Sequence, residues 1–261
     1  MQLAAAAPIL FLFASGAFAD DWSKRWTVGD KAELHVDVYD GRIEVRPSSG
    51  NVIEAHVTTE GWRIRPAEVT ICEWQTGNRI ELKVRVPKHR LQIDFQPRWV
   101  HVELRVPADT YSDLRSGDGS IQIHNVRGSI RAFTGDGSVE ADGVEGSLEA
   151  RTGDGHIKIR GKLDRLDLNT GDGRIEADLR PGSKMSTNWK VTTGDGHVTL
   201  RLPRELNATL DAQTGDGSVT VDLPITVEGK RRAHGMRGKI NGGGEVLMIR
   251  TGDGAIRLEK S

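Results

Sequence analysis

The sequence lacks several features on which other protein classes depend. It contains one cysteine, Cys72, so no disulfide can form within the chain, and we expect a small buried apolar side chain there. Neither charge dominates: 36 basic and 37 acidic residues give a net charge of −1, which argues against a nucleic-acid partner. Beyond the N-terminus, no uncharged run approaches the ~20 residues of a membrane helix. Aromatic residues are scarce at 5%, whereas glycine is abundant at 31 residues, a composition that favours turn-rich β structure.

The first 19 residues, MQLAAAAPILFLFASGAFA, have an apolar centre and a small-x-small end at Ala17-Phe18-Ala19. This pattern predicts a signal peptide over residues 1–19, with cleavage before Asp20. We therefore expect an exported protein that is periplasmic, associated with the outer membrane, or extracellular, with no transmembrane span.

A four-residue phrase recurs through the second half of the chain. It begins as Ser116-Gly-Asp-Gly and returns as Thr-Gly-Asp-Gly from Thr134, Thr152, Thr170, Thr193, Thr214 and Thr251. The first three gaps are 18 residues each, and 23, 21 and 37 follow. A fixed period of this size is typical of a repeat architecture. The longest gap predicts a degenerate coil with its corner at residues 241–244.

Each repeat carries two short runs of alternating polarity, one before the phrase and one after it. In residues 146–160, Leu148, Ala150 and Ile157 share one face, whereas Glu149 and Lys158 share the other. This is strand periodicity with one side buried. Residues 18 apart also carry charges of opposite sign. Three columns show this: Glu140, Lys158, Glu176; Asp142, Arg160, Asp178; and Arg131, Glu149, Asp167, in which only the last step pairs like charges. Stacked parallel strands would place these side chains together, so a parallel stack is favoured over hairpins.

The phrase itself has the residues of a corner. Two glycines flank an Asp that can close an Asx-type turn, and we expect them to supply positive φ. The preceding Thr continues the buried face, where its hydroxyl can bond to another hydroxyl or to the turn.

These patterns predict an all-β protein: a right-handed parallel β-helix, or β-solenoid, with two-strand coils of about 18 residues. Handedness follows only from the general crossover preference. Residues 20–110 are expected to form a less regular N-terminal β region of degenerate coils that caps the regular part, residues 111–261. Within that region, "YDGRIEV" (39–45) and "QTGNRIEL" (75–82) look like altered corners.

Both ends of the predicted stack carry further expectations. Five tryptophans fall in the N-terminal region, at positions 22, 26, 62, 74 and 99. They are expected to pack the cap, with an aromatic sugar-binding platform as the alternative. At the other end the chain stops one strand after its last corner. An open edge is therefore expected there, protected by Arg257, Glu259 and Lys260. Such an edge could accept a partner strand or a second copy of the chain.

The motifs "GRIEV" (41–45), "VHVELRVPAD" (100–109) and "SGDGSIQI" (116–123), with the serial TGDG strands, resemble a known family. It is the bacterial putative-adhesin family of β-strand-repeat proteins, a domain of unknown function related to the head domains of autotransporter-type adhesins. The resemblance implies an exported right-handed parallel β-helix. It implies no reaction, because the family carries no established catalytic motif.

Two kinds of metal site can be weighed. Seven corner aspartates could form a calcium column: Asp118, Asp136, Asp154, Asp172, Asp195, Asp216 and Asp253. Turn geometry is the favoured explanation, because one carboxylate per coil cannot supply the six to eight oxygens that Ca²⁺ takes. His156 and His197 follow corners two coils apart, with Arg174 between them, so they should lie about 10 Å apart and cannot share a zinc ion.

Residues 222–244 form the one basic, glycine-rich excursion. Its charged residues are candidates for an anionic partner such as a polysaccharide or lipid head group, although a solvated loop is the favoured interpretation; they are Lys230, Arg231, Arg232, His234 and Lys239. We expect a non-enzymatic, adhesin-like binding or scaffold protein of the cell envelope, without a cofactor, whose partner is an envelope component, a polysaccharide or another protein. The alternatives are a carbohydrate-active β-helix enzyme, either a polysaccharide lyase or a hydrolase, and a calcium-stabilised extracellular module.

Overall fold

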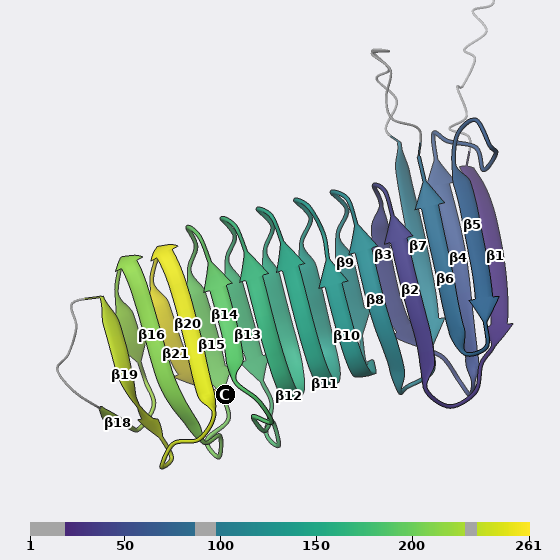
Figure 1. Cartoon of the computed structure of the whole chain (residues 1–261). Helices are drawn as coiled ribbons and strands as arrows, with labels where there is room; N and C mark the ends of the chain where they lie inside the picture. Colours follow the sequence, from purple (N-terminus) through teal and green to yellow (C-terminus); the bar gives the residue numbers. More distant parts are fainter. Residues whose placement is uncertain (1–18, 87–97, 228–233) are drawn as a thin grey trace, which may run out of the picture.

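The computed structural model describes residues 19–86, 98–227 and 234–261, which form an open, elongated array of strands (Figure 1). The described residues contain no helix, and thus none that could cross a bilayer. The predicted signal peptide lies outside the described residues, except Ala19. Cys72 is half-buried rather than buried, and it is a free thiol.

The strands follow one another as β1 (Ala19–Thr27), β2 (Ala32–Val38), β3 (Arg42–Pro47), β4 (Val52–Glu60), β5 (Thr70–Thr76), β6 (Arg79–Arg85), β7 (Trp99–Val106), β8 (Thr110–Ser116), β9 (Ile121–His124), β10 (Arg127–Phe133), β11 (Val139–Thr152), β12 (Ile157–Thr170), β13 (Ile175–Leu179), β14 (Trp189–Thr193), β15 (Val198–Leu202), β16 (Ala208–Asp216), β17 (Val219–Val221), β18 (Ile225–Val227), β19 (Gly235–Ile240), β20 (Val246–Asp253) and β21 (Ile256–Lys260).

Strand pairing forms two ladders joined by the corners. The ladder of strands that precede corners runs β5, β6, β2, β8, β10, the C-terminal halves of β11 and β12, β14, β20, β16, β19 and β18. The ladder of strands that follow corners runs β1, β4, β7, β3, β9, the N-terminal halves of β11 and β12, β13, β15, β21 and β17. Alternate side chains of both ladders form one continuous apolar core.

The predicted register is confirmed in the regular part. Parallel pairing places Ile130 opposite Leu148 and Leu148 opposite Leu166, and all three are buried. The three predicted charge columns also stand in register. Within them, Arg131 Nε lies 2.9 Å from a Glu149 carboxylate oxygen, and Arg160 Nε lies 3.3 Å from one of Asp178.

The predicted open C-terminal edge is wrong. Strand β20 lies between β14 and β16, and β21 lies between β15 and β17, so Arg257, Glu259 and Lys260 belong to an interior strand. Strands β16 and β17 are followed in the chain by the antiparallel pair β18–β19. The chain then returns, and β20 and β21 occupy the positions between β14 and β16 and between β15 and β17. The degenerate corner expected at residues 241–244 is also wrong, because this turn connects β19, which is antiparallel to β16, with β20.

The N-terminal end shows the same kind of return. Strands β2 and β3 pair directly with β8 and β9, while β4 to β7 lie farther out. "YDGRIEV" is an altered corner as predicted, since the Ser116 hydroxyl donates to the Gly41 carbonyl at 2.7 Å. "QTGNRIEL" is not a corner: it is the turn of the antiparallel hairpin β5–β6, with Gly77 at φ 59°.

Close stacking, rather than backbone conformation, explains the corner glycines. The φ of Gly155 lies outside the left-handed region, but a Cβ there would lie 2.0 Å from the carbonyl oxygen of Gly137 in the preceding coil. The Thr hydroxyl bonds to the turn: Thr152 Oγ1 donates toward the carbonyls of Gly135 (3.0 Å) and Gly137 (2.7 Å). The same contacts recur along the stack.

Candidate functional site

The seven corner aspartates all point outward and are exposed. Among the described residues they form no group of three close metal-ligating side chains. Their carboxylates lie along the stack instead, so that Asp154 Oδ1 would be 3.2 Å from a Cβ added to Gly171 in the next coil. Calcium binding at these corners, the less favoured alternative to turn geometry, stays untested.

The two corner histidines bond to backbone. His156 Nδ1 accepts the N–H of Arg174 at 3.3 Å, and His197 Nδ1 accepts the N–H of Ala255 at 3.0 Å. Parallel pairing places His156, Arg174 and His197 in successive coils, as predicted. Each ring therefore joins its own coil to the next one.

The basic excursion is described only in part. His234 Nδ1 lies 3.3 Å from the carbonyl oxygen of Gly217, and Lys239 stands on β19 opposite Thr209 and Thr226. Lys230, Arg231 and Arg232 lie outside the described residues, so neither the anionic-partner site nor the favoured solvated loop is tested.

A groove opens where the regular repeat gives way to the N-terminal strands. Its volume is about 750 Å³. The altered corner, residues 39–42, forms one wall with the corner stacked on it, residues 118–120. The remaining lining comes from Trp62, Val86 and residues 98–101. The groove thus lies across the interface between repeat and cap.

Aromatic rings and cationic groups share this groove. Tyr39 and Trp99 keep 43% and 44% of their surface exposed, unusually much for large apolar side chains. The Arg98 guanidinium lies 4.4 Å from the centre of the Trp62 ring, a cation–π contact. Arg42 Nε donates to Ser120 Oγ at 3.2 Å, which fixes its side chain beside the corner. Flat aromatic faces can stack on sugar rings, and fixed cations beside them can pair with acidic substituents of the sugar.

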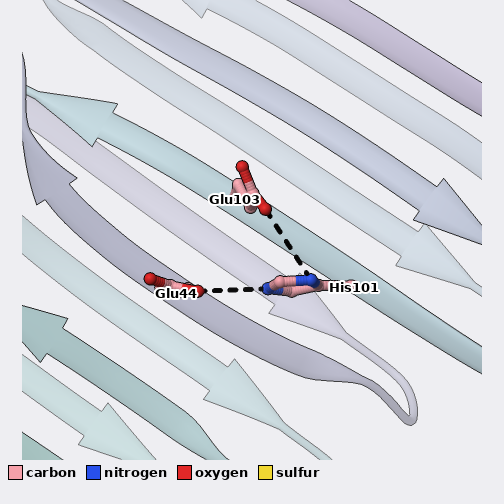
Figure 2. A group of neighbouring side chains, drawn as sticks. All are labelled: Glu44, His101 and Glu103. Carbon is pink, nitrogen blue, oxygen red and sulfur yellow. Dashed lines mark ion pairs between the residues drawn. The ribbon is translucent and has the colours of Figure 1, made fainter.

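A second group of polar side chains lies at the edge of the groove. His101 belongs both to this group and to the lining of the groove. Figure 2 shows His101 between two carboxylates, Glu44 from β3 and Glu103 from β7. His101 Nε2 lies 3.5 Å from Glu44, and Nδ1 lies 3.9 Å from Glu103. Burial raises the pKa of Glu44, but the Arg46 hydrogen bond and charge, with the nearby His101 and His124, hold it below its ordinary value. Glu44 is therefore a carboxylate at neutral pH.

The motifs "GRIEV" and "VHVELRVPAD" contain both strands that supply this site, but the sequence pattern did not single out the residues of the site. Arg42 and Glu44 are the outward positions of "GRIEV", and His101 and Glu103 are those of "VHVELRV". The parallel register that pairs Arg42 with His101 brings them together across 59 residues of chain. Of the five N-terminal tryptophans, Trp26 is buried as predicted, whereas Trp74 and Trp99 are exposed.

The fold defines a class: β-repeat proteins built of stacked parallel strands. The chain belongs to the Toastrack DUF4097 family, whose model matches residues 114–259. That match covers the regular part and leaves most of the groove outside it. No curated protein matches the chain.

Several solved structures are similar to this chain. A putative cell adhesion protein from Clostridium sporogenes is 15% identical, over 93% of this chain and 100% of its own, with a TM-score of 0.41. A putative adhesin from Parabacteroides merdae is 13% identical, over 92% and 96%, with a TM-score of 0.45. A putative lipid binding protein from Parabacteroides distasonis is 12% identical, over 92% and 97%, with a TM-score of 0.35.

Proposed function

We propose that this protein is an exported, non-enzymatic, adhesin-like binding protein of the cell envelope, built as a right-handed β-solenoid, which holds an acidic polysaccharide in the N-terminal groove. The observation that carries the proposal is the pair of exposed rings, Tyr39 and Trp99, in a recess of about 750 Å³ that also contains Arg42 and His101. Binding sites for small ligands and chain segments are concave, with a few placed polar groups among apolar ones.

The arginines of the groove are the groups that would pair with an acidic sugar. Arg42 and Arg98 line the groove and carry their charge at every physiological pH. Asp40 and Asp118 line it as well, so the field is not uniformly positive, and we expect the carboxylates of the ligand to lie on the arginine side.

The test is binding of polygalacturonate, with uncharged dextran as the comparison polymer, measured by calorimetry on residues 20–261. Replacing Trp99 by Ala removes a stacking face, and we expect polygalacturonate affinity to fall about ten-fold, or ~1.4 kcal/mol. Trp74→Ala is the matched control, because Trp74 is 50% exposed but lies on β5, outside the groove lining.

Three results would contradict the proposal: no binding of either polymer, equal loss in the two variants, or equal affinity for dextran. Chain cleavage, seen as new reducing ends or unsaturated products, would overturn its non-enzymatic part. A loss specific to Trp99→Ala, without cleavage, is the expected result.

A further inference from the structure

We infer that Glu44, His101 and Glu103 form a binding site for a divalent transition-metal ion, with Zn²⁺ the best match. One ring nitrogen of His101 and one oxygen from each carboxylate lie within 4.8 Å of one another. One imidazole with two carboxylates is a donor set typical of zinc, and a fourth position would remain for water. The site shares His101 with the groove, but the inference does not rest on polysaccharide binding.

The His101–Glu44 spacing is longer than that of a direct charge-assisted hydrogen bond and is compatible with a shared metal ion. A charge-assisted hydrogen bond between imidazolium and carboxylate has a length of about 2.7–2.9 Å. His101 Nε2 stands 3.5 Å from Glu44, and Nδ1 stands 3.9 Å from Glu103. Ligand atoms around tetrahedral zinc lie about 3.3 Å apart, given bonds of 2.0–2.2 Å. The 3.5 Å between Nε2 and Glu44 is thus close to the spacing of two zinc ligands. Nδ1, the ring nitrogen nearest Glu103, lies on the other edge of the ring and cannot bind the same ion, so Glu103 would have to turn toward Nε2 to complete the site.

Burial gives the site a second basis. His101 Nε2 is buried and makes no hydrogen bond within the described part of the chain. Leaving a buried polar nitrogen unsatisfied is costly, and a bound ion would remove that cost. The Glu44 side chain is only 12% exposed, whereas that of Glu103 is 55% exposed, so the group opens to solvent on one side.

Neighbouring side chains fix the ligands in place. Arg46 Nε donates to Glu44 Oε1 at 2.5 Å, while Glu44 Oε2 faces His101. A hydrogen bond to the oxygen of a ligating carboxylate is the usual outer-shell arrangement at protein metal sites. The parallel pairing of β3 with β7 sets Glu44 directly opposite Glu103, so two rigid strands position the group.

The test is calorimetric titration of ZnCl₂ into tag-free residues 20–261 after treatment with chelator and dialysis, together with thermal melts with and without Zn²⁺. We expect one equivalent to bind and the melting midpoint to rise with Zn²⁺ concentration. Glu103→Gln should weaken Zn²⁺ binding at least ten-fold while preserving the fold, since this side chain is half exposed. His101→Asn should abolish binding.

The controls use residues of the same kind on the same outer face. His156→Asn and Glu140→Gln change a histidine and a carboxylate outside the group, and both should bind Zn²⁺ as the unchanged protein does. Failure of the unchanged protein to take up one equivalent would overturn the inference. So would full-affinity binding by Glu103→Gln or His101→Asn, or equal losses in the control variants. Polygalacturonate binding measured in chelator reports separately on the groove.

Discussion

At the scale of single residues, the corner phrase is determined by contacts along the stack. The second glycine of each corner lies against the backbone of the preceding coil, and a Cβ there would approach a carbonyl oxygen to between 1.9 and 2.3 Å. The Thr hydroxyl donates toward the same carbonyls, and the Asp points outward. Of the four positions, only the Asp is free to change without disturbing the coil below.

This contrast can be measured at one corner. Gly155→Val places a side chain onto the Gly137 carbonyl, and since backbone cannot rotate away, we expect a loss of more than about 3 kcal/mol. Asp154→Asn keeps the size and exposure of the side chain, so its effect should stay within about 0.5 kcal/mol. Urea unfolding gives both values, and similar losses in the two variants would contradict the stacking explanation. Melts of the unchanged protein with Ca²⁺ and then with chelator test the alternative of a calcium-stabilised module, which requires the melting midpoint to move.

At the scale of strands, the sequence predicts which strands pair where neighbouring coils carry complementary charges. It does not predict the pairing where two strands carry the same repeat phrase. Charge alternation identified the coils on either side of Lys158, because stacking Glu140 directly on Glu176 would place like charges together. The order of β20 and β16 could not be predicted, since Thr251 and Thr214 begin the same phrase and either could stack on Thr193. The groove could not be predicted for a related reason. Tyr39 and Trp99 come to line it because β3 pairs with β7, and this long-range pairing does not show in the spacing of residues along the sequence.

Asp211 on β16 connects the returning strand β20 with the outer strand β19. Its carboxylate lies 2.9 Å from Arg237 on β19 and 3.1 Å from Arg250 on β20. Burial raises the pKa of Asp211, but hydrogen bonds from both arginines and their charges hold it below its ordinary value. The folded pKa is therefore depressed, and the resulting stability is present above pH ~4 and is lost as pH falls through the folded value.

Asp211→Asn should therefore destabilise the protein by about 2 kcal/mol at pH 7, with a smaller difference at lower pH. Denaturant unfolding between pH 7 and pH 2.5 measures it. The matched control is Asp216→Asn, at the exposed corner end of the same strand, which should change stability little at any pH. A difference between Asp211→Asn and the unchanged protein that grows as pH falls would refute this assignment.

At the scale of the whole molecule, the order of coils in space differs from their order in the chain at both ends. Strands β2 and β3 are interior although they come early, and β20 and β21 are interior although they come last. Pairings such as Thr193 with Thr251 therefore span 58 residues, whereas neighbouring regular coils span 18. High sequence separation slows folding, so the two ends should form after the central coils.

The interior position of the last coil predicts the effect of truncation. In a simple linear stack, removing the terminal repeat leaves the others intact. Here the removal of residues 246–261 deletes the only parallel partners of β16 and β17 among the described strands. We expect β16 to β19 to lose amide-exchange protection and to be cleaved rapidly by protease, while β8 to β13 stay protected. One outcome would contradict this expectation. Because β16 carries the same repeat phrase as β20, it could pair with β14 in place of the missing strand. Retained protection over residues 208–216 would show that the stack can close without its last coil.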